Sequence, residues 1–437
     1  MAVLLAAVGC AGTRSSATAA ETTWTAASGN DWFLETNWTT VVPNGTGDVA
    51  VFPTHAIQWP HVPADQEATL GRLVLSAERS LSISGDGGLN FSNPGDAPAE
   101  IIVPSSEIRV TATIQPSVSA ASGERLHLEV AAGDRLTLSG GFGSGDGRIV
   151  KRGFGRLLLN TPSPGWEGAL TVEQGLVAIG SADVLGSTEQ GTTIDGGTVS
   201  IEAPTAEPFA LGFGTIETTA HSLRLGGHVT LINESQSRLS GSFVLSGGVS
   251  GDGDLILQPT HSAATSIRDV PLSHAGGLTI ANYSFNAGLA DINIDNSYPG
   301  PTEIVHAHVT VRAPLGLGSA DAGTTVDRST LRLHAASPES VSLKESTLAF
   351  HGALQPTGEQ LVTGSFVLNN SLLTTQGDRA TEHYVVQQTI SLEGDLNTIA
   401  TETGALTLAG GVLGSGRLAI EPGHQPVSIG GVLDGDI

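Results

Sequence analysis

The sequence is poor in cysteine, in aromatic side chains and in positive charge, and each shortage excludes a class of protein. Cys10 is the only cysteine among 437 residues, which excludes an internal disulfide and a cysteine-based metal site. The chain carries 19 Lys and Arg against 43 Asp and Glu, a formal net charge of −24, so it lacks the basic surface that nucleic acid requires. Aromatic residues make up 4%, so a core must be built from Val, Leu, Ile and Ala.

Glycine, by contrast, is abundant, with 57 residues, and it recurs at fixed places in repeated segments. Segments 136–150, 243–257 and 406–420 share an alternating apolar triplet, a Gly-Gly pair, a Gly-x-Gly turn and a second alternating triplet. Because alternation of apolar and polar residues indicates a strand, each segment predicts strand, turn, strand. The structural turn glycines are predicted to be Gly145, Gly147, Gly251, Gly253, Gly414 and Gly416.

Longer repeats indicate how the strands are arranged. Residues 175–203 align without gaps on residues 307–335, and Gly-Gly-Val-Leu at 410–413 recurs twenty residues later at 430–433. A unit this short cannot bury its apolar face alone, whereas stacked coils bury a continuous core and pair every backbone amide. The sequence therefore predicts an all-β fold, a right-handed single-stranded parallel β-helix (a solenoid) with strands about 4.8 Å apart along its axis.

The repeats resemble the autotransporter-associated β-strand repeat. Residues 145–159 carry its Gly-x-Gly turn, basic strand and Leu-x-Leu strand, and residues 164–172 carry its second half. The resemblance is good over 140–203, weaker over 247–335, and after 406 it is cut off part-way through a repeat. It implies a passenger-like β-helix at a bacterial cell surface. It implies no fixed activity, because this fold serves many functions.

The N-terminus has features of an export signal. Residues 2–9 are an apolar run too short to span a bilayer, and Cys10 follows directly, as in a bacterial lipobox. We predict a leader over 1–20, with Cys10 as a lipid attachment site or, alternatively, ordinary cleavage near Ala20. Either route leads to an extracellular or outer-membrane-associated location. Contact with a membrane is expected only through this lipid or through a C-terminal barrel beyond Ile437, where the last repeat is cut off.

Four of the five tryptophans, Trp24, Trp32, Trp38 and Trp59, lie in the first sixty residues. They could form a sugar-stacking platform, but we favour an N-terminal β cap that covers the open edge of the solenoid. The predicted domains are thus the leader 1–20, a Trp-rich cap over 21–60, and a β-helix over 61–437 with repeats near 136–203, 243–335 and 406–437.

Residues that could carry chemistry are scattered. Asp146 and Asp252 lie in Gly-Asp-Gly turns, where aspartate is a good turn residue, and their copies are too far apart for a calcium repeat. His306 and His308 alternate on a strand, with His334 further on, and an exposed face is the favoured interpretation. The acids nearest a basic residue are Asp291, Asp295 and Glu303, without a specific spacing.

We therefore expect no catalytic residue, no metal ligand and no cofactor. The predicted function is that of an exported structural or adhesive repeat protein, whose partners are surface glycans or surface proteins of other cells and not nucleic acid. The alternative is a polysaccharide lyase or hydrolase, or a glycan-binding protein, on the same scaffold. A groove that gathers acids, arginine and aromatic residues would favour this alternative.

Overall fold

The computed structural model describes most of the chain beyond the leader. The described residues are 19–54, 59–76, 80–105, 109–181, 183–260, 264–282, 288–351, 359–376, 382–421, 423 and 425–434. Cys10 lies outside them.

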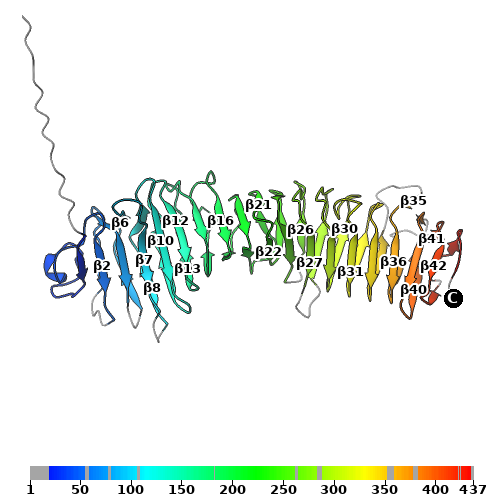
Figure 1. The fold of residues 1–437 in the computed structure, drawn as a ribbon, viewed down its shortest axis with the longest axis horizontal. Helices are drawn as coiled ribbons and strands as arrows, with labels where there is room; N and C mark the ends of the chain where they lie inside the picture. Colours follow the sequence, from blue (N-terminus) through cyan, green and yellow to red (C-terminus); the bar gives the residue numbers. More distant parts are fainter. Residues whose placement is uncertain are drawn as a thin grey trace, which may run out of the picture.

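The chain folds as an all-β parallel solenoid of about 16 turns, which confirms the predicted fold class. Successive coils follow one another from one end of a long rod to the other (Figure 1). The described residues contain one short 3-10 helix, Glu35–Asn37. The predicted right-handedness and the cap function of the first residues stay predictions.

One sheet runs through nearly the whole rod, and we call it the central sheet. Its 16 strands are β5 (Leu81–Ile83), β8 (Thr111–Ile114), β11 (Arg135–Leu138), β13 (Arg156–Leu159), β15 (Leu176–Ile179), β17 (Thr198–Ile201), β19 (Thr215–Glu217), β22 (Gln236–Ser240), β25 (Asp254–Gln258), β27 (Leu278–Ala281), β29 (Thr302–Val305), β31 (Thr324–Asp327), β33 (Val341–Lys344), β36 (Phe366–Asn369), β39 (Ile390–Glu393) and β42 (Val412–Gly414).

A second sheet, the N-terminal sheet, covers the first half of the rod. Its 11 strands are β1 (Glu21–Thr23), β2 (Val49–Phe52), β4 (Arg72–Leu75), β7 (Ala99–Val103), β10 (Arg125–Val130), β12 (Arg148–Arg152), β14 (Leu170–Val172), β16 (Thr192–Asp195), β18 (Phe209–Gly212), β21 (Val229–Leu231) and β24 (Val249–Gly251).

A third sheet, the C-terminal sheet, covers the second half. Its ten strands are β20 (Leu223–Leu225), β23 (Phe243–Leu245), β26 (Thr265–Ile267), β28 (Gly288–Ile292), β30 (Ala307–Val311), β32 (Thr330–Leu333), β34 (Thr347–His351), β37 (Leu372–Gln376), β40 (Asn397–Thr403) and β43 (Leu418–Glu421). Two small sheets add a further face near the ends: β3 (Glu67–Leu70), β6 (Gly88–Phe91) and β9 (Ser117–Ala120), then β35 (Glu359–Val362), β38 (His383–Val386), β41 (Ala405–Leu408) and β44 (Val427–Ile429).

The alternating pattern becomes a column of aliphatic side chains inside the rod. In the central sheet the parallel register stacks six side chains from consecutive coils, all fully buried: Ala112, Leu136, Leu157, Val177, Val199 and Ile216. Side chains of opposite parity point outward on the same strands. Each coil thus covers the apolar face of its neighbours, as the repeat argument requires.

The predicted strand–turn–strand units differ in detail from those observed. The first unit contains β11 and β12, as expected, but the units at 243–257 and 406–420 each contain a third short strand, β24 or β42. These strands lie between the Gly-Gly pair and the Gly-x-Gly turn, because the segment there pairs with a neighbouring coil. Near the C-terminal end Val412 pairs with Leu433, one residue beyond the expected twenty-residue interval.

Trp24, Trp32 and Trp38 are buried around Phe52 at the N-terminal end, with ring centroids 4.9–5.9 Å apart. Trp59 is partly buried against the same core. Because the first three rings are at most 4% exposed, they have no free face for a sugar, and the sugar-stacking interpretation of this cluster is wrong.

Candidate functional site

The six turn glycines show two different backbone requirements. Gly145, Gly251 and Gly414, the first of each Gly-x-Gly turn, have φ of 132°, 106° and 126°, a region that side-chain-bearing residues rarely adopt. The second glycines, Gly147, Gly253 and Gly416, lie so close to the previous coil that a Cβ would collide with its backbone. These turns position the side chains that flank them.

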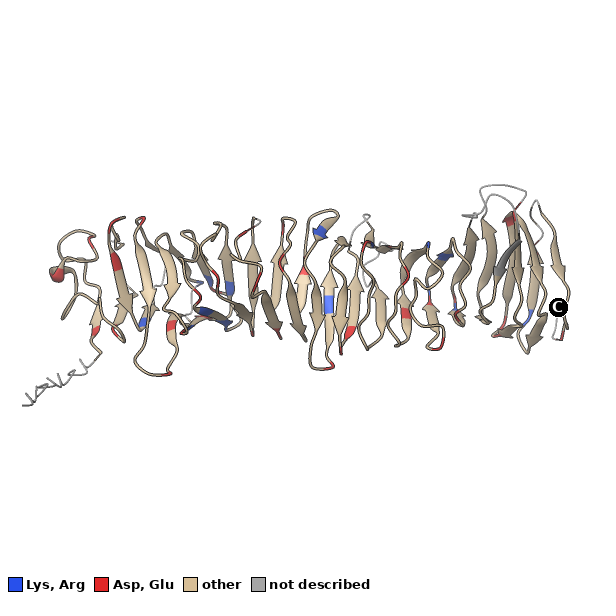
Figure 2. Ribbon diagram, turned by 90° about the horizontal axis from the view of Figure 1, so that it is seen from above, with Lys and Arg blue, Asp and Glu red and all other residues tan. Residues whose placement is uncertain are grey.

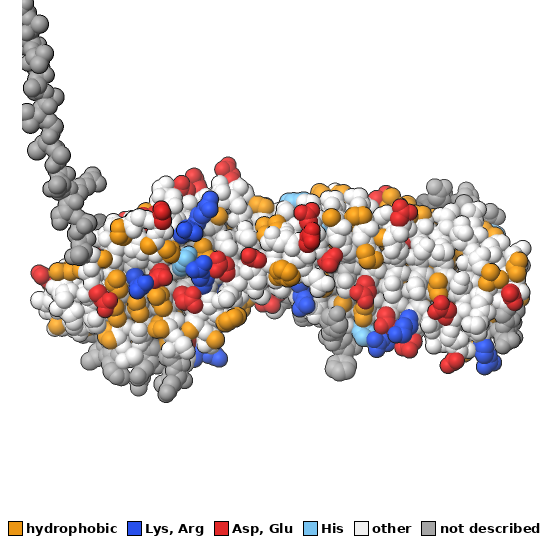
Figure 3. Space-filling model, viewed as in Figure 1, with side chains coloured by type: hydrophobic (Ala, Val, Ile, Leu, Met, Phe, Trp, Pro, Cys, Tyr) orange, Lys and Arg blue, Asp and Glu red, His pale blue; other side chains and the backbone are white. Residues whose placement is uncertain are grey.

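Beside the first of these turns is a polar cleft on the side of the rod, with a volume of about 360 Å³. Its lining comes from three consecutive coils and one further loop: Gly123, Arg125, Asp146, Arg148, Glu167, Gly168, Ala169 and Gln190. We call this the lateral cleft. In the space-filling view, charged side chains of both signs and a histidine gather on the N-terminal third of the rod (Figure 3).

Parallel register arranges the charged side chains of the cleft in two short columns. Arg125 of β10 pairs with Arg148 of β12, which puts two guanidinium groups on adjacent coils. The parallel β-bridge between Gly145 and Trp166 likewise puts the next residues, Asp146 and Glu167, side by side on adjacent coils. A column of two arginines therefore stands beside a column of two carboxylates.

The charged groups of the cleft are exposed and make no side-chain hydrogen bond or ion pair with the described residues. This holds for Arg125, Arg148, Asp146 and Glu167. In a chain with few cations, two neighbouring arginines without a carboxylate partner are free to bind a ligand. Elsewhere the positive and negative residues are spread along the rod without a continuous band of one sign (Figure 2).

The neighbouring charges on the same sheet are already engaged. Arg152 binds the carboxylate of Glu173 at 2.7 and 3.3 Å, and its guanidinium lies 3.0 Å from Nδ1 of His127. Burial and then the charge of Arg152 lower the pKa of His127, which favours the neutral ring, and since arginine can only donate, Nδ1 accepts this hydrogen bond. These three side chains satisfy one another and do not line the cleft.

Lys151, the basic residue of the repeat motif, points inward and is fully buried. Its Nζ donates to the carbonyls of Arg152 at 2.6 Å, Gly153 at 2.7 Å and Gln174 at 3.3 Å. Burial lowers its pKa to about 8. Three carbonyls at a corner of the coil are thus satisfied by one ammonium group, a structural role.

Two buried glutamates were not predicted from the sequence. Glu207 accepts a hydrogen bond from Oγ1 of Thr192 at 2.9 Å, and Glu339 accepts one from Oγ1 of Thr324 at 2.6 Å. Both carboxyl groups are at most 4% exposed, and burial raises the pKa of each to about 7. A signal was present in the sequence: the blocks 175–203 and 307–335 are offset by 132 residues, and extending their alignment past residue 203 pairs Glu207 with Glu339.

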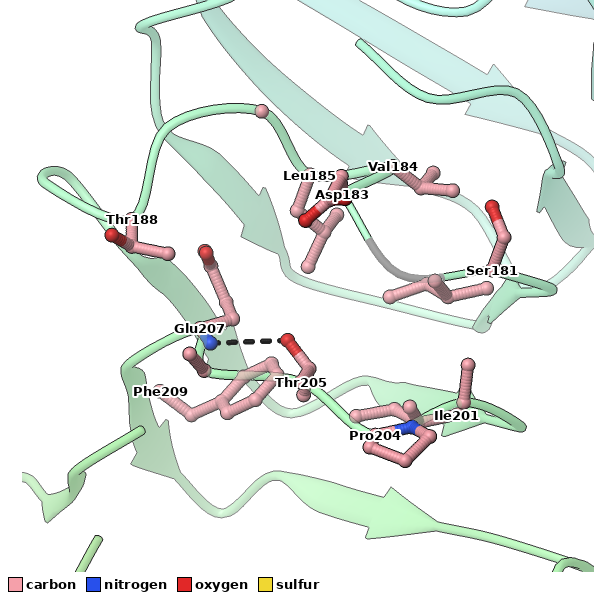
Figure 4. A pocket seen from close by; sticks show the side chains of 14 residues that line it. Ser181, Asp183, Val184, Leu185, Thr188, Ile201, Pro204, Thr205, Glu207 and Phe209 are labelled. Carbon is pink, nitrogen blue, oxygen red and sulfur yellow. Dashed lines mark hydrogen bonds between the residues drawn. The ribbon is translucent and has the colours of Figure 1, made fainter. Parts of the chain in front are cut away.

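Glu207 also lines a small pocket of about 80 Å³. Figure 4 shows the loop with Ser181, Asp183, Val184 and Leu185 on one side, and the segment from Ile201 to Phe209 on the other. A pocket of this size is well below the ~300 Å³ at which ordinary ligand sites begin. The lateral cleft is therefore the stronger candidate for a binding site.

The other residues singled out from the sequence do not converge. Asp291 forms an ion pair with Arg312 at 3.1 Å, and the Asp295 carboxylate accepts the Leu315 N–H at 2.8 Å. Glu303 is exposed on β29, in the central sheet, whereas Asp291 is on β28 of the C-terminal sheet.

The histidines and the remaining turn aspartate are likewise separate. His306 precedes β30 with φ of 51°, and His308 lies on that strand with its pKa lowered by burial. His334 stacks on His351 with ring centroids 4.4 Å apart, and Asp252 is exposed in its turn. Among the described residues no three His, Cys, Asp or Glu side chains are grouped to hold a metal ion. Nor is any helix in this part of the chain long and apolar enough to cross a membrane.

Comparisons of the chain with protein-family models, with curated proteins and with solved structures found no match.

Proposed function

We propose that this chain is an exported adhesive rod that binds a surface glycan through the lateral cleft, without catalysis. The leader with Cys10 and the resemblance to autotransporter-associated repeats support a place at the bacterial cell surface. The rod would hold the cleft away from that surface, anchored by a lipid or by a further C-terminal segment. The observation that carries the proposal is the pair of unengaged arginines beside a pair of unengaged carboxylates.

A glycan matches this arrangement because each hydroxyl group both donates and accepts a hydrogen bond. Arg125, Arg148 and Gln190 offer donors, and Asp146 and Glu167 offer acceptors, within one cleft. The volume of about 360 Å³ lies at the lower end of the range for small-ligand sites, which is ~300–1,000 Å³. The carboxylates and the net charge of −24 disfavour a polyanionic ligand.

Glycan-array binding with the purified full chain tests the proposal. Replacing both arginines, Arg125→Ala with Arg148→Ala, should weaken binding at least ~10-fold, since two charge-assisted hydrogen-bond donors are lost. The matched control replaces Arg135 and Arg156, which pair in the same way on the central sheet and are exposed but do not line the cleft. Equal losses in both double variants, or no glycan bound by the wild type, would refute the assignment.

The same cleft also favours a second candidate, a glycoside hydrolase. Asp146 and Glu167 lie on adjacent coils, and two neighbouring carboxylates are what hydrolysis of a glycosidic bond requires. Reducing-sugar release from the bound glycan distinguishes the two functions. Adhesion predicts no release; release that disappears in Asp146→Asn and Glu167→Gln would establish the enzyme instead.

A further inference from the structure

Two phenylalanines are exposed on a rod whose other described Phe, Tyr and Trp side chains are buried or partly buried. Phe154 is 72% exposed and Phe213 is 65% exposed. Because aromatic residues are only 4% of the chain and most of the other described rings are buried in the core, exposed rings need an explanation. Neither ring lines the lateral cleft.

Both rings lie on the same corner of the solenoid, where the chain passes from the N-terminal sheet to the central sheet. Phe154 connects β12 to β13, and Phe213 connects β18 to β19. The sheet order β12, β14, β16, β18 puts them three coils apart, about 14 Å along the rod axis. At this corner the coils between them contribute Gln174 and the side-chain-free Gly196.

The corner requires a left-handed backbone at position 213, as at Gly153, Gly175 and Gly196, but it does not require a phenylalanine there. The φ of Phe213 is 58°, in the left-handed region that bulky residues rarely adopt, and its neighbours are Gly212 and Gly214. A glycine at position 213 would adopt this conformation without strain. A large apolar side chain that is both strained and exposed indicates selection for what the ring contacts outside the fold.

Phe154 is held just as firmly by its neighbours. It lies between Gly153, with φ of 69°, and Gly155, and a Cβ at either glycine would collide with the backbone of the previous coil. The two rings are therefore presented by turns whose paths are fixed by close packing. With the backbone fixed, only the two side-chain torsions of each ring remain to be ordered when a ligand binds.

We infer that Phe154 and Phe213 form a stacking platform for a linear polysaccharide that lies along the rod axis. The apolar C–H face of a pyranose ring stacks on an aromatic ring, and an extended chain can reach both rings at once. Gln174 and Asp195, which border the corner and are exposed, offer hydrogen-bond partners to hydroxyl groups. The platform is separate from the lateral cleft, at the other end of β12, and its assignment does not depend on that of the cleft.

A protein partner fits the same surface less well. Stable protein interfaces need roughly 1,000 Å² of complementary surface with a continuous apolar centre. Here two isolated rings stand about 14 Å apart with polar residues and a glycine between them. Nucleic-acid bases, which also stack on aromatic rings, are disfavoured by the net charge of −24.

Affinity electrophoresis of the full chain through gels that contain xylan, mannan or β-1,3-glucan tests the platform. The wild type should be retarded by at least one polymer, and Phe154→Ala with Phe213→Ala should reduce the affinity at least tenfold. Leu396→Ala, which removes a 51% exposed apolar side chain at a different turn, should leave the affinity unchanged.

Phe213→Gly separates a binding role from a structural one. It should weaken polysaccharide binding while the melting temperature stays equal or rises, because the left-handed backbone is relieved. Wild-type chain that no polymer retards, or a double variant that binds as the wild type does, would overturn the platform. So would self-association of the wild type that the double variant abolishes, since the rings would then join two copies. The Arg125→Ala, Arg148→Ala double variant is run in the same gels. A loss of affinity in that variant alone would assign binding to the cleft, and a loss in the phenylalanine variant alone would assign it to the platform.

Discussion

The same sequence block folds twice in this rod, on different faces. Residues 175–203 form β15, β16 and β17, which belong to the central, N-terminal and central sheets. The aligned residues 307–335 form β30, β31 and β32, which belong to the C-terminal, central and C-terminal sheets. The block therefore specifies the path of one coil, its strands and its corners, but not the face of the rod that each strand occupies.

The change of face takes place in the middle of the rod. Coils on the N-terminal side use the N-terminal and central sheets, and coils on the C-terminal side use the central and C-terminal sheets. Residues 223–251 contribute to both the N-terminal and the C-terminal sheets. There each coil has three strands, as in β20, β21 and β22. Only the central sheet continues through this region, so it transmits the register from one half to the other.

The packing just before the block is also retained in both copies. Trp166 and Tyr298 occupy equivalent positions 132 residues apart, and both are buried. In the first copy the backbone N–H of Ser187 donates to the Trp166 carbonyl at 2.9 Å; in the second, Ser319 donates to the Tyr298 carbonyl at 3.0 Å. Local contacts are thus preserved while the long-range sheet partners change.

The largest predicted effect on stability comes from replacing these two buried aromatic residues with alanine. Trp166→Ala and Tyr298→Ala should each cost about 3–5 kcal/mol of local stability, because a large buried side chain is replaced by a cavity. Hydrogen exchange should detect the loss in the coils next to each mutation. If exchange rises equally along the whole rod, the two copies do not act as separate local units.

The buried glutamates predict a pH dependence common to both copies. Glu207 and Glu339 have folded-state pKa values raised from 4.5 to about 7, so the folded chain binds these protons more tightly than the unfolded chain does. The free energy of unfolding that this tighter proton binding adds is complete below pH 4.5. It is lost as the pH rises through 7, by about 3 kcal/mol per site.

Denaturant unfolding across this pH range checks the prediction. Glu207→Gln combined with Glu339→Gln should remove most of the fall in stability between pH 4.5 and 8. The exposed Glu189→Gln serves as control and should retain the wild-type slope. A double variant that keeps this slope would show that the two carboxyl groups are already ionised in the folded protein.

A smaller effect is expected at the glycine turn beside the cleft. Gly145→Val should destabilise the fold by about 1–3 kcal/mol, because φ of 132° is unfavourable for a β-branched residue. A Cβ at Gly145 has open space, whereas one at Gly251 would collide with the Leu231 carbonyl, so Gly251→Val should cost more. Thermal unfolding of both variants measures the difference, and unchanged unfolding of Gly145→Val would contradict the role of backbone conformation.

The smallest effect has the opposite sign. Phe213→Gly should stabilise the chain by up to ~1 kcal/mol, since relief of the left-handed conformation exceeds the entropy that glycine adds to the unfolded state. Phe154→Gly, between two glycines and without a left-handed φ, serves as the comparison and should not stabilise. Destabilisation by Phe213→Gly would mean that the ring contributes to the fold.

The sequence predicted the parallel solenoid because alternation and glycine spacing are local signals that each coil repeats. The change of face was not predictable, since the strands of every sheet carry the same alternation. The lateral cleft was missed because its charged residues come from neighbouring coils. Arg125 lies beside Arg148, and Asp146 beside Glu167, only once the coils are stacked in the observed register. Glu207 was missed because a single glutamate in a polar segment is typical of a solvated loop.

The most direct test of the proposed function is a crystal structure of the full chain with the glycan that it binds most tightly in the array. We predict a sugar in the lateral cleft, with hydroxyl groups accepting hydrogen bonds from Arg125 and Arg148 and donating to Asp146 or Glu167. A glycan bound elsewhere, with all four side chains unoccupied, would contradict the assignment of the cleft.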